Sequence, residues 1–265
     1  AVTAAEASDA GQKSIEHMTR MVLAVSSQEA ELMPKVAQAA SLDGNSTRMV
    51  VNRLEAGSID SYSPAKADRL YALLIKNGTW ECPTLVELRG SSFFDDPLVD
   101  DPNDPRLKYV SSSMRRNWRQ GGVSSKRTAE DFVAAKRIYN KKLEMVRAME
   151  RAGVGILAGS DMGNPYVFPG FGLHDELELL VKAGLTPMQS LQTATLNPAR
   201  YLGKERELGT IEDGKLADLV LLDANPLTDI RNTRKIDAVV VAGKWVDKAQ
   251  LQAMLAQVEA ANRDR

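Results

Sequence analysis

The amino-acid sequence predicts an α/β fold in which parallel strands alternate with helices, followed by a smaller unit of short strands. Three strand-like runs are each followed by helical sequence: Lys13–His17, Thr79–Leu85 and Val154–Ser160. Strands that are repeatedly followed by helices form βα units, which place their strands parallel in one sheet. After Gly203 the pattern changes to short strands at Ala217–Leu222 and Ala238–Val241, joined by tight turns.

Start and stop signals mark the helices of the first half. The first residues are expected to form a helix that ends at Gly11. Ser26, with Glu29 three residues later, has the form of a capping box, so a helix is expected to begin there. Another helix begins at Ser63-Pro64 and ends at Asn77-Gly78, because proline is favoured in the first helical turn and glycine after the last.

A long helix is predicted to begin after Thr128, which forms a capping box with Asp131, and to end at Gly153. Its apolar residues recur with the helical period and mark a buried face. Its basic residues are assigned to the solvated surface: Lys136, Arg137, Lys141 and Lys142.

Residues 90–106 form a loop rich in Asp and Pro. Clustered carboxylates can hold calcium, but their spacing here does not match the EF-hand loop. A solvated surface loop is therefore the preferred interpretation.

Helices also follow the third strand, and their predicted limits are Leu173 to Gly184, Thr186-Pro187 onward, and Asn197-Pro198 to Gly203. In the last part of the chain, Asp247 and Gln250 form a capping box for a terminal helix.

Composition excludes several classes of partner. The chain has 265 residues, of which 43% are hydrophobic, and this is enough for a buried core. Its 34 basic and 35 acidic residues are interleaved, so no basic surface for nucleic acid or an anionic membrane is expected. No apolar run approaches the roughly 20 residues that span a bilayer. The single cysteine, Cys82, is assigned to the core.

The first eleven residues lack an initiator Met and the basic and apolar regions of a signal peptide. We therefore expect the true N-terminus to lie upstream. A soluble protein is expected, but its compartment, cytoplasmic or exported, stays open.

Three segments resemble the end of an amidohydrolase of the imidazolonepropionase-like or prolidase-like subgroup. They are Gly11-Gln-Lys-Ser-Ile-Glu-His17, Gly-Ile-Leu-Ala-Gly-Ser-Asp161, and Leu208-Gly-Thr-Ile-Glu-Asp-Gly-Lys-Leu-Ala-Asp-Leu-Val-Leu-Leu-Asp223. The resemblance covers almost the whole chain and implies a partial TIM-type (β/α) barrel. Residues 1–203 would hold strands six to eight with their helices, and residues 204–265 a small C-terminal β-domain with a terminal helix.

Asp161 is the first candidate catalytic residue. It ends a buried-type strand, and the carboxyl ends of the strands carry the catalytic groups of barrel enzymes. The resemblance implies that this aspartate binds metal and takes a proton from the attacking water, and a carboxylate suits both tasks. From the spacing alone, a helix cap or an Asx turn would be the plainer interpretation.

His17 is implied as a second metal ligand, since it matches the histidine at the end of the sixth barrel strand. Glu16 is expected on the opposite face of that strand, as a packing partner or as a support for the metal ligands. Trp80 is assigned to barrel packing, with lining of the pocket as the alternative. His174 is either a substrate contact or a structural cap, and the loop after Asp161 offers further candidate substrate neighbours: Met162, Asn164 and Tyr166.

The number of possible ligands limits what this chain can do alone. A catalytic zinc usually takes three protein ligands, but the chain has two histidines, one cysteine and no His-x-His pair. We therefore expect the C-terminal part of a longer enzyme that holds one or two zinc or other divalent ions. The missing half would supply the remaining ligands.

The expected reaction is hydrolysis of a C–N bond in an amide, dipeptide or cyclic amide by metal-activated water. The isolated chain is expected to be inactive, and to form homo-oligomers or to require its missing N-terminal half. Two alternatives stay open: a non-catalytic remnant that serves as a binding or assembly module, and an enzyme made of two chains.

Overall fold

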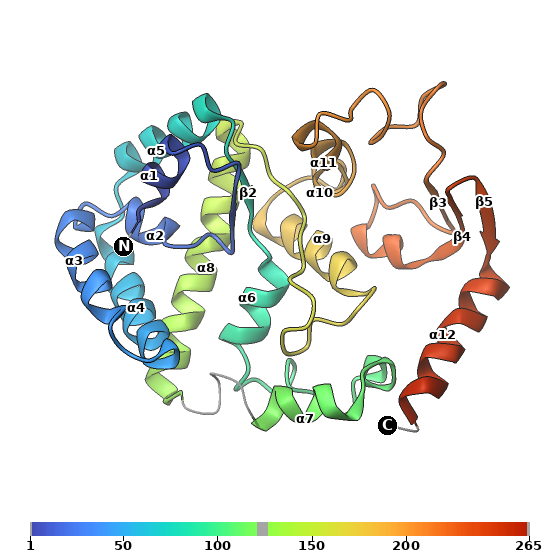
Figure 1. Cartoon of the computed structure of the whole chain (residues 1–265), viewed down its shortest axis with the longest axis horizontal. Helices are drawn as coiled ribbons and strands as arrows, with labels where there is room; N and C mark the ends of the chain where they lie inside the picture. The colour runs from blue at the N-terminus through green and yellow to red at the C-terminus, as the bar shows by residue number, and fades with distance from the viewer. Residues whose placement is uncertain (1, 121–126, 264–265) are drawn as a thin grey trace.

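The computed structural model describes residues 2–120 and 127–263. It shows a helical body with a short parallel sheet, and a smaller antiparallel sheet that continues into the terminal helix (Figure 1). The helices are α1 (Ala4–Asp9), α2 (Met21–Ala24), α3 (Glu29–Ala39), α4 (Gly44–Ser58), α5 (Pro64–Asn77), α6 (Leu85–Ser92), α7 (Ser112–Gln120), α8 (Ala129–Ala152), α9 (Gly172–Ala183), α10 (Pro187–Thr193), α11 (Leu196–Tyr201) and α12 (Lys248–Arg263). Short 3-10 turns are η1 (Ile59–Ser61), η2 (Pro105–Tyr109) and η4 (Ile230–Arg234).

The predicted parallel strands lie side by side in chain order. Strand β1 (Ser14–Glu16) pairs in parallel with β2 (Trp80–Cys82), with Ile15 opposite Glu81. On the other side of β2, Glu81 forms a single parallel bridge with Ile156. The third predicted strand is thus reduced to one bridge, and all three segments are shorter than the sequence pattern indicates.

The mixed α/β class is confirmed, but the partial barrel is not. Within the described ranges the sheets are small and open, with strand orders β1-β2 and β3-β4-β5. A barrel requires tilted strands that each pair on both sides until the sheet closes. In the described part of the chain, β1 pairs with a strand on one side only.

Helices cover one face of the parallel strands and form the main core. The long helix α8 packs against α6 and α9 and runs beside β2 (Figure 1). The core joins Ile15 and Ile156 of the parallel strands to fully buried side chains of α5, α8 and α9: Leu74, Val146, Met149 and Leu180. Burial of these apolar side chains holds the strand ends in fixed positions.

Most predicted helix limits are confirmed. Ser63 caps α5 and Gly78 ends it, and the capping boxes of Thr128 with Asp131 and Thr186 with Gln189 are both present. The predicted cap at Ser26 is wrong, because α3 begins at Glu29 after Gln28. The hydroxyl of Ser26 instead accepts from the Gln28 N–H at 3.0 Å and bonds the hydroxyl of Ser61.

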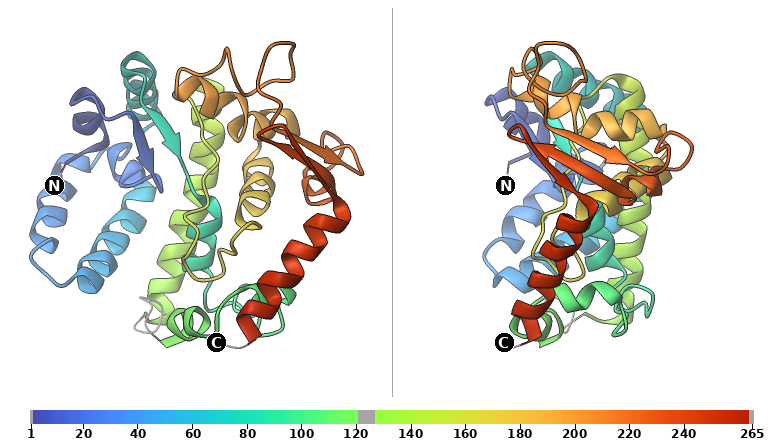
Figure 2. Two further views of the ribbon diagram at one scale, coloured as in Figure 1. Left: turned by 45° about the vertical axis from the view of Figure 1, so that its right-hand side comes forward. Right: turned by 90° about the vertical axis from the view of Figure 1, so that its right-hand side faces the viewer.

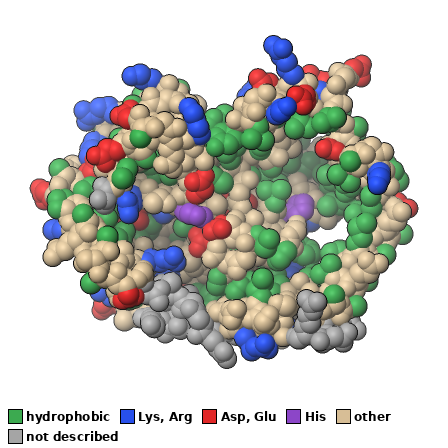
Figure 3. Space-filling model, in the orientation of Figure 1, with side chains coloured by type: hydrophobic (Ala, Val, Ile, Leu, Met, Phe, Trp, Pro, Cys, Tyr) green, Lys and Arg blue, Asp and Glu red, His purple; other side chains and the backbone are tan. Residues whose placement is uncertain are grey.

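The C-terminal part forms a separate antiparallel sheet of β3 (Leu219–Leu222), β4 (Ile236–Val241) and β5 (Lys244–Asp247). Both views of Figure 2 show α12 leaving this sheet, and it packs against η2, where Lys108 Nζ lies 3.0 Å from Glu259 Oε2. Hydrophobic side chains gather around this part of the surface (Figure 3). The exposed ones include Val220, Leu221, Trp245 and Met254. The domain boundary at residue 203 stays a prediction.

Within the described ranges, the helices are too short or too polar to cross a lipid bilayer.

Candidate active site

Three polar residues follow the parallel strands at their carboxyl ends. His17 comes after β1, Thr84 after β2, and Asp161 after the segment that contains Ile156. All three have left-handed backbone, with φ of 63°, 46° and 50°. This conformation is unfavourable for residues other than glycine, and it persists where surrounding contacts enforce it, often at functional sites.

His17 and Asp161 face each other across the ends of the strands. Nε2 of His17 lies 3.6 Å from Oδ2 of Asp161, and the side chains are 39% and 44% exposed. This separation is too long for a hydrogen bond. Two ligand atoms that each lie about 2.1 Å from a tetrahedral ion are roughly 3.4 Å apart. The pair therefore fits two ligands of one metal ion better than a direct bond.

Thr84 orients the imidazole of His17. Its hydroxyl oxygen lies 2.7 Å from Nδ1 of His17 and is buried. A hydrogen bond on one ring nitrogen fixes the ring and leaves the other nitrogen for a ligand, which is the usual arrangement of metal-binding histidines. Nε2 consequently faces Asp161.

Two buried side chains hold the backbone around His17. Lys142 of α8 donates from Nζ to the His17 carbonyl oxygen at 3.0 Å, and Oε1 of Glu81 accepts from the Met18 N–H at 3.0 Å. Lys142 is 6% exposed and Glu81 is fully buried. The assignment of Lys142 to the solvated surface is therefore wrong, because this side chain turns inward from an otherwise basic helix.

Buried carboxyl groups near the strand ends have shifted pKa values. Burial raises the pKa of Glu81 well above its usual range, although the Met18 N–H and Lys142 act against this. Burial likewise raises the pKa of Glu176 in α9 to about 8. Oε2 of Glu176 accepts from the Val86 N–H at 2.7 Å, so this side chain caps the first turn of α6.

Asn164 holds the carboxylate of Asp161. Its Nδ2 donates to Oδ2 of Asp161 at 2.9 Å and to the Asp161 carbonyl oxygen at 3.1 Å. This short loop contact fixes a carboxylate that is otherwise open to solvent.

His17 and Asp161 line a pocket of about 450 Å³. Charged side chains from α4, α6 and α8 form the other walls: Arg48, Glu55, Glu87 and Lys142. Burial raises the pKa of Glu87, the nearby carboxylate of Asp161 adds to this, and His17 opposes it. The pocket thus brings both signs of charge close to the pair, and its volume is suitable for a small substrate.

The other predicted substrate contacts are dispersed. Asn164 lines the pocket, whereas Met162, Tyr166 and His174 are outside its lining in the described part of the chain. Tyr166 is buried among the rings of Phe94, Trp118 and Phe168, and its hydroxyl donates to Asp100. Met162 is 56% exposed.

His174 belongs to a different contact. Its Nδ1 lies 3.0 Å from the Thr233 hydroxyl, which joins α9 to η4, and burial together with Arg234 lowers its pKa. Glu16 was expected to pack against neighbouring residues, but it is exposed and accepts from the Ser14 hydroxyl at 2.5 Å.

The described residues do not complete a metal site around the pair. Among residues 2–120 and 127–263, no group of three His, Cys, Asp or Glu side chains could hold an ion. The donor atoms present therefore fit part of a metal site, and a third protein ligand is needed to complete it.

Thr84, Glu81, Lys142 and Glu87 were not predicted as site residues. The sequence offered a signal for two of them, because Glu81 lies in the second predicted strand and Thr84 lies near its carboxyl end. Lys142 and Glu87 lie on helices, where sequence indicates no direction toward the site.

The chain aligns with only part of the length of its curated relatives. Imidazolonepropionase from Pseudomonas aeruginosa is 39% identical over 167 residues, which are 62% of this chain and 40% of that protein. Ochratoxinase from Aspergillus niger is 30% identical over 112 residues, which are 42% of this chain and 22% of that protein. The chain thus spans less than half the length of these relatives.

Solved structures and the family profile complete the comparison. Bottromycin amidohydrolase has a TM-score of 0.67 and 21% identity, covering 98% of this chain and 51% of that one. A Xaa-Pro dipeptidase with bound methionine has a TM-score of 0.54 and 21% identity, covering 92% of this chain and 42% of that one. At this identity the likeness concerns the fold. The sequence profile of the amidohydrolase family matches residues 75–246, which confirms the predicted resemblance: the chain belongs to the amidohydrolase family.

Proposed function

We propose that this chain carries part of the active site of a metal-dependent hydrolase that cleaves the C–N bond of an amide, dipeptide or cyclic amide. The observation that carries the proposal is the pair formed by His17 and Asp161 at the strand ends. Their facing atoms are 3.6 Å apart, which suits a shared ion, and the chain belongs to the amidohydrolase family.

His17 Nε2 and Asp161 Oδ2 would hold a divalent ion, with zinc as the first candidate because imidazole and carboxylate both suit it. One or two ions would be present in the complete site. When bound, such an ion lowers the pKa of a coordinated water and polarises the carbonyl group of the substrate.

The side chains of this chain perform the remaining tasks. Asp161 accepts a proton from the attacking water, and Asn164 keeps the carboxylate aimed at the pocket. Thr84 and Lys142 keep His17 in place. Asn164 is the best supported substrate neighbour because it lines the pocket. Roles for Met162, Tyr166 and His174 would require a substrate that extends beyond it.

The remaining ligands would come from polypeptide outside these 265 residues, either upstream in the same protein or in a partner chain. In the described ranges the free side of β1 can accept a further strand, and unpaired strand edges recruit other chains. We therefore propose that the isolated chain is inactive and that it associates with itself or with the missing half. Residues 1–203 and 204–265 would be the barrel part and the β-domain of the complete enzyme.

A binding or assembly module is the second candidate. The observation that favours it is the lack of a three-ligand group among the described residues. Such a module would keep the strand ends and the pocket without metal chemistry.

Expression of the chain with and without the coding sequence upstream of Ala1 distinguishes the two candidates. The hydrolase proposal predicts one or two zinc ions per assembled protein by elemental analysis, and their loss in a His17→Ala, Asp161→Ala variant. A His174→Ala variant, the matched control, should retain the metal. An upstream sequence without metal ligands, together with a metal-free assembled protein, would favour the module.

A further inference from the structure

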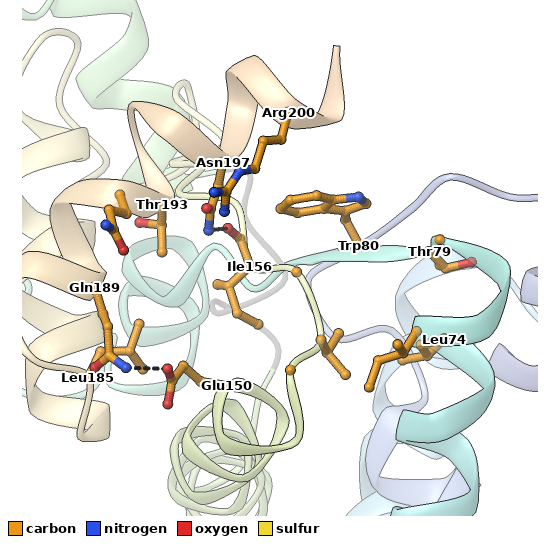
Figure 4. A pocket seen from close by; sticks show the side chains of 16 residues that line it. Leu74, Thr79, Trp80, Glu150, Ile156, Leu185, Gln189, Thr193, Asn197 and Arg200 are labelled. Atoms are coloured by element: carbon orange, nitrogen blue, oxygen red, sulfur yellow. Dashed lines mark hydrogen bonds between the residues drawn. The ribbon is translucent and has the colours of Figure 1, made fainter. Parts of the chain in front are cut away.

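A second pocket lies at the opposite end of the parallel strands from His17 and Asp161. It has a volume of about 520 Å³, within the range of roughly 300–1,000 Å³ that small-molecule sites occupy. Its walls come from the start of β2, from residues 153–156, and from α5, α8, α10 and α11 (Figure 4). All of the lining residues belong to the described part of the chain.

Trp80 provides a fixed aromatic surface in this pocket. Its indole lies against the backbone at Gly155, where an added Cβ would come within 2.2 Å of the ring. From another side, Tyr201 contacts the indole edge to face, with the ring centres 6.0 Å apart. Because Trp80 is only partly buried, its remaining surface stays open to a ligand.

Arg200 provides a free positive charge at the same end of the pocket. Figure 4 shows its side chain extending from α11 and lying beside Asn197. Asn197 is fixed by a 2.9 Å bond from Nδ2 to the Ile156 carbonyl oxygen, whereas the guanidinium of Arg200 has no hydrogen bond or ion pair with the described residues. A guanidinium in this position can bind a carboxylate through two parallel hydrogen bonds.

The other charged side chain of the pocket is Glu150, whose hydrogen-bond partner is the neutral amide of Gln189 rather than a cation. Oε1 of Glu150 accepts from the Gln189 side chain, on the wall formed by α8 and α10 (Figure 4). Apolar side chains also line the pocket, and they include Leu74, Ile156 and Leu185. The pocket therefore combines one guanidinium, one partly exposed indole ring and apolar side chains, with the carboxylate of Glu150 on the wall formed by α8 and α10.

We propose that this pocket binds a small aromatic carboxylate, whose ring packs on Trp80 and whose carboxylate pairs with Arg200. The site is separate from the proposed catalytic pair, because Trp80 and Ile156 begin the strand segments that Thr84 and Asp161 end. The inference does not depend on the proposed hydrolase function.

Calorimetric titration of the 265-residue chain with 2-naphthoate tests the proposal. We expect saturable binding of one equivalent, and much weaker binding of the neutral 2-naphthamide and the cationic 2-naphthylmethylamine. Arg200→Gln should weaken 2-naphthoate binding roughly tenfold to a hundredfold, the range for a lost charge-assisted hydrogen bond. Trp80→Leu should weaken it by about threefold to tenfold, through loss of the aromatic contact.

Two controls make the result specific. Arg206→Gln removes an exposed arginine outside the pocket lining and should leave the affinity unchanged. Asp161→Asn should also leave it unchanged, because that residue lines the other pocket. If Trp80→Leu unfolds, Trp80→Phe takes its place as the test variant, because phenylalanine retains a ring. Equal binding of acid and amide, equal effects of Arg200→Gln and Arg206→Gln, or no saturable binding would overturn the proposal.

Discussion

The two ends of the parallel strands adopt the same backbone conformation with different residues. At their amino ends, the left-handed positions are glycines, and their φ values are 92° at Gly11, 65° at Gly78 and 92° at Gly153. At their carboxyl ends, the left-handed positions are residues other than glycine: His17, Met18, Thr84 and Asp161. Glycine adopts this conformation without steric cost, whereas other residues lose about 1–2 kcal/mol.

The difference shows which requirement dominates at each end. Gly78 and Gly153 end α5 and α8 and turn the chain into the strand segments, so only the backbone matters there. At the other end the side chains of His17 and Asp161 are retained despite the strain, and contacts such as that from Lys142 offset it. Left-handed backbone also occurs at Arg20, Tyr166 and Ala242, so the contrast concerns the two strand ends and not strain in general. Each prediction below tests one side of this contrast.

The largest effect is expected at Asp161. In the assembled, metal-loaded protein, Asp161→Asn should lower kcat by at least about a hundredfold, because the amide cannot accept the proton of the water. Steady-state kinetics on the hydrolysed substrate measures this, and circular dichroism checks that the fold is intact. Near-normal turnover would remove Asp161 from the proposed mechanism.

The buried Glu176 side chain, near the carboxyl ends of the parallel strands, should make the free energy of unfolding depend on pH. Its pKa of about 8 lies above that of an unfolded glutamate, so between these values the folded state holds a proton that the unfolded state has released. The stability that the protonated Glu176 contributes is therefore complete at low pH and is lost as the pH rises toward 8.

Because Glu176→Gln is neutral in both states, its free energy of unfolding relative to the parent should rise by about 2 kcal/mol between roughly pH 6 and roughly pH 7.5. Denaturant unfolding at each pH measures this difference. Glu178→Gln, which removes a carboxylate at a half-exposed position of the same helix, is the control. Parallel curves for the two variants would contradict the buried, protonated state of Glu176.

Lys142 should contribute to stability through the strained His17 backbone. Lys142→Met leaves the His17 carbonyl oxygen without this donor, and we expect a loss of about 1–2 kcal/mol in the free energy of unfolding. Lys35→Met makes the same change at an exposed position of α3 and should alter stability by less than about 0.5 kcal/mol. Chemical denaturation that gave both variants equal stability would show that the buried contact is dispensable.

The smallest effect is expected at Gly78, which precedes the amino end of strand β2. Gly78→Ala should destabilise the fold by about 1 kcal/mol, because its φ is 65° although an added Cβ would meet no atom within 4 Å. Gly57→Ala, in α4 and equally uncrowded, should be neutral or stabilising. Thermal unfolding of the two variants tests the contrast. A shift of the same sign and size in both would mean that the left-handed conformation does not set the cost at Gly78.

Sequence alone predicted the features that depend on near neighbours in the chain. Capping boxes join residues three apart, and glycine ends a helix through its own φ, so the limits of α5 and α8 could be read directly. Ser26 shows where this reasoning fails: its hydroxyl bonds Ser61, 35 residues away, and α3 begins later. Helices α4 and α7 were not predicted, although Asp43 and Ser111 precede them and accept from the N–H groups of Ser46 and Met114.

The parallel pairing of the strands was predicted from the alternation of strand-like and helical sequence, whereas the catalytic candidates were named from the resemblance to amidohydrolases. The structure brings His17 and Asp161 together at one edge of the strands, 144 positions apart in the chain and 3.6 Å apart in space. Sequence could not show that Lys142 turns inward, that Tyr166 joins an aromatic cluster, or that His174 bonds Thr233. Each of these depends on which distant side chains surround the residue, and only the packed tertiary structure decides that.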